Sequence, residues 1–374
     1  MNKSIFPLLL SLALPAFSAK DVIVAGANVS AWRGFNLLER FDVRKNDPHT
    51  GFQEDDFKWI SGFGFNFVRL PLDYRLYVKN GDKKEGWCDF DEAGLKFVDQ
   101  AIEYGKKYHI HVSINLHHAP GYYVFKQAKG FNDELWTQKD AQDAFVAHWV
   151  MFAKRYRRVP SKQLSFNLLN EPKRITEEQY VTLFRRTIDA IRAIDPQRLI
   201  IVDGLSTDDR ASAKFPVPAI YKLPNVVIAA RGYTPNEVTH YKIPWITGAD
   251  KWPVPEWPAD ITAEGQTALE KKGVAEFLAY YKPWEDAIQD GAKVMVGELG
   301  VYNKTPHEVV LRWMESCFKL YKQMNIGWAL WNFRGDPTSP FGPLDSQRED
   351  VTYEDFHGHK LDREMMNLLQ KYRK

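Results

Sequence analysis

The sequence reads LSFNLLNEP at 164–172, TEEQYVTLFRRTIDAIRAIDP at 176–196 and LIIVD at 199–203. The first and third stretches are short apolar runs with the length of buried strands, whereas the second carries apolar residues at helical spacing. Thr176 and Gln179 have the spacing of a capping box, which predicts a helix start, and the proline that ends the stretch cannot continue a helix. A strand, a helix and a second strand are therefore predicted, a unit typical of a parallel sheet.

The same alternation recurs along the chain and predicts the fold class. We expect eight strands, at 32–36, 65–71, 110–117, 164–171, 199–203, 226–233, 294–298 and 326–331. Eight strands separated by helices favour an α/β fold in the form of a closed (β/α)8 TIM barrel. An open doubly wound sheet has the same alternation, but its nucleotide-binding form lacks the expected Gly-x-Gly-x-x-Gly after the first strand.

Two further helix starts are predicted from a side-chain oxygen followed three residues later by Glu. Asp89 with Glu92 precedes one amphipathic stretch, and Thr305 with Glu308 precedes another. Pro306 then takes the first helical position, which suits its fixed backbone angle.

The segment 234–265 follows the predicted sixth strand and interrupts the alternation. It contains five prolines together with Trp245, Trp252 and Trp257. Long loops in compact domains are usually functional or disordered, and three tryptophans are costly to leave in water. We expect this extended loop to form a wall or lid of a ligand cleft.

Residues 1–19 have the order of a secretory signal peptide, with Lys3, an apolar run and a small-residue end. The run is too short to cross about 30 Å of hydrocarbon. We expect a signal peptide at 1–19, a single barrel domain at 20–374, secretion to the extracellular space or periplasm, and no membrane attachment after cleavage.

The amino-acid composition indicates which kinds of molecule the protein binds. The chain has 50 Lys and Arg against 48 Asp and Glu, a net charge of +2, which favours neither nucleic acid nor an anionic membrane. Aromatic residues make up 14% of the chain, and flat rings with a polar edge suit sugar rings. We expect a carbohydrate substrate, a monomer, and no metal or other cofactor. Whether Cys88 and Cys317 pair is left open.

In a (β/α)8 barrel the site lies at the C-terminal ends of the strands. The polar or aromatic residues at those predicted ends are Arg69, His117, Asn170, Glu171, Arg231, Tyr233, Glu298 and Trp331. Two of them, Glu171 and Glu298, are carboxylates that close apolar strands. Hydrolysis of a glycosidic bond needs one carboxyl group that donates a proton and a second that attacks or activates water. Glu171 and Glu298 are therefore the candidate pair.

Six motifs in order resemble glycoside hydrolase family 5, the family of many cellulases and related β-glycanases. They are RGFNL at 33–37, FVRLP at 67–71, NLHHAPG at 115–121, NEP at 170–172, GE at 297–298 and WALW at 328–331. An Asn-Glu-Pro alone is weak evidence for this family. Six motifs in the same order are stronger evidence, and they span almost the whole chain after the leader. The resemblance implies a retaining glycosidase that acts on a β-glucan-type polysaccharide or oligosaccharide.

The same resemblance implies a role for each site residue. Glu171 is expected to be the acid/base and Glu298 the nucleophile of a double displacement. Asn170 is expected to bind the sugar 2-hydroxyl. The other expected contacts are Arg69 and Tyr233 beside Glu298, His117 and His118 on substrate hydroxyls, and Trp331 beneath the reacting sugar.

The chain departs from the family pattern at the end of the sixth strand, where Arg231-Gly232-Tyr233 replaces the usual His-x-Tyr. Alternate residues of a strand share a face, so Arg231 is expected to point into the same cleft as Tyr233. We expect its guanidinium near Glu298 or the sugar, where it would join Arg69 in lowering the pKa of the nucleophile.

Two competing functions remain open. A metal-dependent hydrolase is suggested by His109, His111, His117 and His118, although the first two open a strand and so lie at the barrel floor. The other is a catalytically silent carbohydrate-binding barrel, in which Arg231 marks the loss of turnover.

Overall fold

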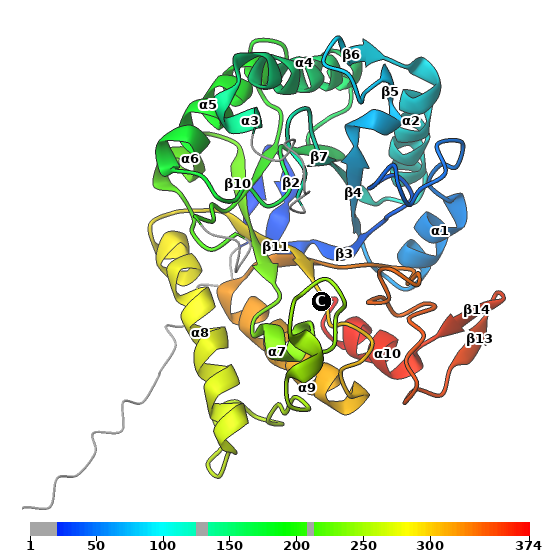
Figure 1. The fold of residues 1–374 in the computed structure, drawn as a ribbon, viewed down its shortest axis with the longest axis vertical. Helices are drawn as coiled ribbons and strands as arrows, with labels where there is room; N and C mark the ends of the chain where they lie inside the picture. The colour runs from blue at the N-terminus through cyan, green and yellow to red at the C-terminus, as the bar shows by residue number, and fades with distance from the viewer. Residues whose placement is uncertain (1–20, 125–133, 208–212) are drawn as a thin grey trace, which may run out of the picture.

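The structure is a computed structural model that describes residues 21–124, 134–207 and 213–374. The predicted signal peptide at 1–19 lies outside the described residues. Within these ranges eight parallel strands close into one barrel, which Figure 1 shows as a ring with helices around its outside. The strands are β3 (Arg33–Asn36), β4 (Phe67–Asp73), β7 (His111–His118), β8 (Leu164–Asn167), β9 (Ile200–Asp203), β10 (Val226–Gly232), β11 (Val294–Leu299) and β12 (Gly327–Leu330). The predicted (β/α)8 barrel is confirmed.

Each strand pairs in parallel with the next along the chain, and β12 pairs back with β3. Trp328 lies opposite Arg33 in that last pairing, which closes the ring. The fourth strand is shorter than the predicted 164–171. Glu171 has a φ of 48°, in the left-handed region, so the extended backbone has already ended before it.

Helices connect the strands and bury one apolar face each against the barrel. The principal ones are α1 (Glu54–Gly62), α2 (Glu92–Lys107), α4 (Lys139–Tyr156), α5 (Glu177–Arg192), α6 (Pro218–Tyr221), α8 (Ala268–Gln289), α9 (His307–Met324) and α10 (Arg363–Lys371). In α5 the buried residues include Leu183, Phe184, Ile188 and Ile191, at the three- and four-residue spacing of one helix face.

The helix starts show which capping predictions were right. The capping box of Thr176 and Gln179 is formed at the start of α5 and is confirmed. Asp89 was the wrong cap for α2, because the carboxylate that accepts the Ala93 N–H is that of Asp91.

The predicted cap of α9 was also wrong. Thr305 Oγ1 donates to the Val238 carbonyl at 2.6 Å instead of capping a helix. The helix begins two residues later, at His307, with Pro306 in the cap position. Thr305 therefore ties the loop between β11 and α9 to Val238, which lies in the helix Asn236–Thr239.

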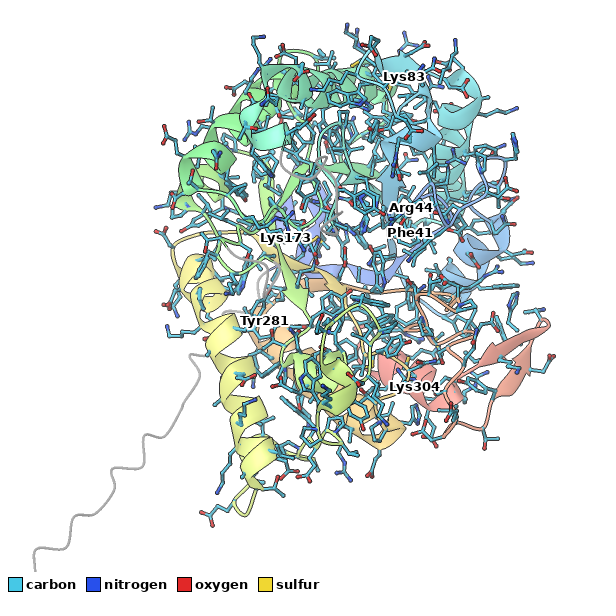
Figure 2. All side chains as sticks on the ribbon, in the orientation of Figure 1. Phe41, Arg44, Lys83, Lys173, Tyr281 and Lys304 are labelled. Atoms are coloured by element: carbon cyan, nitrogen blue, oxygen red, sulfur yellow. The ribbon has the colours of Figure 1, made fainter. Side chains whose placement is uncertain are left out.

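The core has two layers. Trp32, Phe67, Ile201 and Met295 fill the inside of the barrel with other apolar residues. A larger cluster occupies the shell between the strands and the helices. Figure 2, which labels Phe41, shows side chains crowding the opening of the ring of strands, and apolar residues fill the barrel as a packed core.

The predicted extended loop after the sixth strand is present between β10 and α8. It contains α7 (Asn236–Thr239) and a short 3-10 helix, η3 (Ala249–Lys251). Trp257 is buried beside Phe277 of α8, with ring centroids 5.6 Å apart, whereas Trp245 is 46% exposed. One tryptophan therefore anchors the loop.

In the part of the chain that the structure describes, three two-stranded sheets lie outside the barrel: β1 (Ile23–Val24) with β2 (Ala27–Asn28), β5 (Val78–Asn80) with β6 (Gly86–Phe90), and β13 (Glu354–Phe356) with β14 (His359–Leu361). Over the described ranges every helix is too short or too polar to span a lipid bilayer. Both Cys88, which is exposed on β6, and Cys317, which is buried in α9, are free thiols.

Candidate active site

Polar side chains gather at the end of the barrel where the strands finish. The carboxyl ends of parallel strands meet at one edge, so residues far apart in sequence come together there. The predicted site residues that reach this end are Arg69, His117, Asn170, Glu171, Arg231, Tyr233, Glu298 and Trp331. Contacts among them build the site.

Glu298 is held by two hydrogen-bond donors. Arg69 Nη1 donates to Oε1 at 2.6 Å, and the Tyr233 hydroxyl donates to Oε2 at 3.1 Å. Arg231 Nη2 lies 3.4 Å from Oε1. The side chain is 4% exposed, so both carboxylate oxygens are fixed at the floor of the site.

Arg69 is itself fixed by three amide side chains. Its Nε donates to Asn167 Oδ1 at 2.7 Å, Nη1 donates to Asn36 Oδ1 at 2.9 Å, and Nη2 donates to Asn170 Oδ1 at 2.7 Å. The guanidinium is 1% exposed. A rigid fork that is bonded at every nitrogen gives Glu298 one orientation.

Arg231 lies beside Glu171, with its Nε 3.4 Å from Glu171 Oε1. Its Nη2 donates to Asp203 Oδ2 and, at 3.0 Å, to Asn170 Oδ1. A Cβ on Gly297 would lie 2.8 Å from Nη1, so this glycine leaves the space that the guanidinium occupies. The cation that replaces the usual imidazole therefore points into the site and contacts both catalytic candidates.

Burial raises the pKa of Glu298, while Arg231 and Arg69 oppose that rise. The predicted position of the Arg231 guanidinium near Glu298 is confirmed, and both cations act to lower this pKa, but the prediction of a net depression was wrong. The cost of removing a carboxylate from water outweighs the attraction of both guanidinium groups. We therefore expect the acid limb of a pH profile to lie above the range of an exposed glutamate.

An aromatic wall stands beside the carboxylates. The rings of His117 and Trp331 stack with centroids 5.6 Å apart, and Phe41 meets Trp331 edge-on at 5.8 Å. Ile243 and Ala249 of the loop after β10 belong to the same apolar cluster as Trp331. Burial lowers the pKa of His117 well below its usual range, so this imidazole stays neutral.

His118 meets the other predicted site residues through His117, with ring centroids 4.9 Å apart, and lies behind it. It is fully buried, and it stacks on Tyr123 with centroids 3.8 Å apart. Its ring lies near the carboxylates of Asp42 and Asp73, and the ligand atoms of the three residues fall within 4.8 Å of one another.

Both carboxylates of this group form ion pairs with arginines. Arg44 Nη2 lies 2.8 Å from Asp42 Oδ2, and Arg75 Nη2 lies 2.6 Å from Asp73 Oδ2. A divalent cation would have to displace these charges. His111 is fixed at the opposite end of the strand by Ser165 Oγ, at 2.9 Å, so the suggested histidine ligands do not converge.

Two residues at predicted strand ends were missed in the sequence, and so was Asn167 within the fourth predicted strand, which accepts from Arg69. Asn36 ends β3 and contacts Arg69, and Asp203 ends β9 and contacts Arg231. Both are the last polar residue of a predicted strand, so the rule that found the other site residues applies to them as well.

Comparison with solved structures supports the barrel fold. One crystal structure of a glycoside hydrolase is 37% identical, covers 92% of this chain and 99% of its own, and superposes with a TM-score of 0.80. The endoglucanase Cel5A of Thermotoga maritima superposes with a TM-score of 0.69 over 91% of this chain and 97% of its own. At 24% identity the second likeness concerns the fold alone.

Proteins related to this chain in sequence include an endoglucanase and a cellodextrinase. Endoglucanase C of Acetivibrio thermocellus is 26% identical over 337 residues, which are 83% of this chain and 91% of that protein. Cellodextrinase A of Ruminococcus flavefaciens is 26% identical over 318 residues, 81% and 83% of the two chains. The family model for cellulase, glycosyl hydrolase family 5, matches residues 23–336. The chain therefore belongs to glycosyl hydrolase family 5 and is a glycosidase that hydrolyses O-glycosyl bonds.

Proposed function

We propose that the protein is a secreted, retaining β-glucan hydrolase in which Glu298 is the nucleophile and Glu171 the acid/base. The observation that carries the proposal is the placement of the two glutamates. They follow or end β8 and β11, and each has a carboxylate oxygen 3.4 Å from the same guanidinium, that of Arg231. Two carboxyl groups at one barrel mouth are what glycoside hydrolysis requires.

The two environments support different roles. Glu298 accepts from Arg69 and Tyr233 and is 4% exposed, which suits an oriented nucleophile. The Glu171 side chain is 12% exposed, so it can reach water and exchange a proton during each turnover. Different surroundings for two like carboxyl groups allow one to be ionised while the other carries a proton.

In the first step Glu171 donates its proton to the glycosidic oxygen while Glu298 attacks the anomeric carbon. The carbon–oxygen bond breaks, and a glycosyl ester of Glu298 forms. In the second step Glu171 takes a proton from water, whose oxygen attacks the same carbon and releases Glu298. Two inversions leave the anomeric configuration unchanged.

The surrounding groups suit a neutral sugar. Asn170 Oδ1 accepts from both arginines, at 2.7 and 3.0 Å, so its amide N–H groups are left to donate to a sugar hydroxyl. Trp331 and His117 provide a stacked wall for an apolar ring face. A β-glucan substrate also agrees with relatives named endoglucanase and cellodextrinase. Secretion is supported by the apolar run and small-residue end within 1–19.

The test is hydrolysis of a panel of β-glucans, mannans and xyloglucans by the purified chain and by Glu298→Gln. We expect turnover of β-glucan by the parent, and a loss of at least about a thousandfold in the variant with folding and glucan binding retained. Glu308→Gln, on the exposed face of α9, is the matched control and should keep full activity.

NMR of the first product molecules should show retained configuration. Inverted products would contradict the double displacement. Binding of glucan by a parent chain that never releases product would favour the silent carbohydrate-binding barrel.

A further inference from the structure

Asp203 ends β9 directly beneath the proposed acid/base, and no role was predicted for it. We propose that Asp203 is a positioning residue that fixes Glu171 and balances the charge introduced by Arg231. This inference rests on the proposed function and extends it to a residue outside the catalytic pair.

Asp203 is fully buried and uses both carboxylate oxygens. Oδ2 accepts the backbone N–H of Glu171 at 2.9 Å and also accepts from Arg231 Nη2. Oδ1 accepts from Asn167 Nδ2 at 3.0 Å. One carboxylate therefore ties the strand ends of β8, β9 and β10 together.

The contact between Asp203 and the Glu171 backbone stabilises an uncommon backbone conformation of Glu171. Glu171 has a φ of 48°, and a non-glycine residue rarely adopts this left-handed region without support. A charged acceptor on its N–H stabilises that conformation. Asp203 thereby fixes the direction in which the Glu171 side chain leaves the strand end.

The second role follows from counting charges. Arg69 and Arg231 bring two positive charges, while Asp203 and an ionised Glu298 bring two negative ones. Glu171 must carry a proton to act as an acid. Without Asp203 the site would hold one uncompensated cation 3.4 Å from Glu171, and this cation would favour loss of the proton.

The other titratable groups around the site add no charge to this sum. Burial raises the pKa of Tyr233 well above its usual range, and it also raises that of Tyr280 on α8, whose hydroxyl accepts the Arg231 N–H at 2.8 Å. His117 on β7 is held neutral by burial. These three groups are uncharged near neutral pH, so two guanidinium groups and three carboxyl groups determine the local charge.

A double-mutant cycle of charge-neutralising substitutions tests the proposal through the pH dependence of kcat/KM on a soluble β-glucan. Asp203→Asn removes the negative charge, so both limbs should move to lower pH, by about one unit. Arg231→Gln removes the positive charge, so both limbs should move to higher pH. Joining the two changes should return the profile to within a few tenths of a unit of the parent.

A purely structural Asp203 would give another pattern. Asp203→Asn would then lower the melting temperature or kcat while the limbs stayed in place, and that result would overturn the proposal. If Asp203→Asn is too weak to give a profile, the double variant decides. If the double variant is at least tenfold more active than Asp203→Asn, Asp203 compensates the charge of Arg231. If the double variant is no more active than Asp203→Asn, this role of Asp203 is refuted.

The same experiment separates this inference from the proposed function. An inactive parent, or a Glu171→Gln variant with unchanged turnover, would refute the catalytic assignment itself. An active parent that depends on Glu171, with unmoved limbs in Asp203→Asn, would refute the role of Asp203 alone.

Discussion

Trp331 follows β12 with 8% of its surface exposed, and its ring stacks on His117 beside the two carboxylates. If this ring lies beneath the reacting sugar, Trp331→Ala should lower kcat/KM roughly thirtyfold, equivalent to about 2 kcal/mol of transition-state binding. Steady-state kinetics on a soluble β-glucan measures the loss. A Phe at the same position should recover part of it, because it retains a flat apolar face.

The matched control for this prediction is Trp328, which lies on the same strand. Its ring packs against Phe318 of α9, with centroids 4.6 Å apart, on the helix-facing side of the barrel. Trp328→Phe should lower the melting temperature and leave kcat/KM unchanged. The Trp331 assignment is wrong if Trp331→Ala also behaves in this way.

The strand-end rule located most of the site from sequence but left out Asp203. In the sequence Asp203 precedes a glycine, and Asp-Gly is also a common turn dipeptide. Its partner Arg231 comes 28 residues later, and only barrel closure brings the two together. The sign of the Glu298 pKa shift was equally out of reach, because burial depends on the packing of every neighbouring strand.

At the scale of elements, two of the three tryptophans in the loop between β10 and α8 differ in exposure to solvent. Trp257 is 1% exposed, and its indole N–H donates to Ser316 Oγ at 3.0 Å. Trp257→Ala should therefore destabilise the protein by about 3–5 kcal/mol. Trp245 is 46% exposed, so Trp245→Ala should change the free energy of unfolding by no more than about 0.5 kcal/mol.

Urea unfolding of the two variants measures both values. Equal midpoints for Trp257→Ala and Trp245→Ala would show that the loop is not anchored through Trp257. Because Ile243 and Ala249 pack in the cluster of Trp331, release of the loop should also lower activity in Trp257→Ala.

Helix starts show where local sequence was enough and where it was not. The box of Thr176 and Gln179 is satisfied within four residues, so its pattern predicted the start of α5 correctly. Thr305 has the same pattern, but its hydroxyl bonds to Val238 across the structure. A hydroxyl that finds a tertiary partner no longer caps a helix, and the local sequence does not contain that partner.

Across the whole molecule, the eight strands and their order followed from the alternation of apolar runs and amphipathic stretches. The closure of the ring is a different property, since it depends on the pairing of β12 with β3, almost 300 residues apart, as in Trp328 with Arg33. An open sheet has the same local pattern, so the barrel was favoured by the number of strands and by the family motifs.

Burial of neutral histidines gives the whole molecule a predictable response to acid. Burial lowers the pKa of five histidines, to about 3 for His111, to about 4 for His118, His148 and His240, and well below its usual range for His117. In the unfolded chain these groups take up protons near pH 6.5. Between about pH 6.5 and 4 the unfolded state therefore binds protons that the folded state does not.

The free energy of unfolding should consequently fall as the pH drops through this window, by up to about 1.4 kcal/mol per pH unit for each histidine. Glu39 acts in the opposite direction, because burial and Asp56 raise its pKa to about 8 and its protonated form gains stability on acidification. Burial also raises the pKa of Asp56, Glu285 and Glu298, which act in the same direction as Glu39. Five histidines stand against these four carboxyl groups, so the net change should be a loss of stability. Urea unfolding at pH 7, 6 and 5 measures the slope. His148→Gln should lower that slope, and replacement of the exposed His49 is the surface control. Equal slopes in the parent and in His148→Gln would show that His148 does not resist protonation in the folded protein.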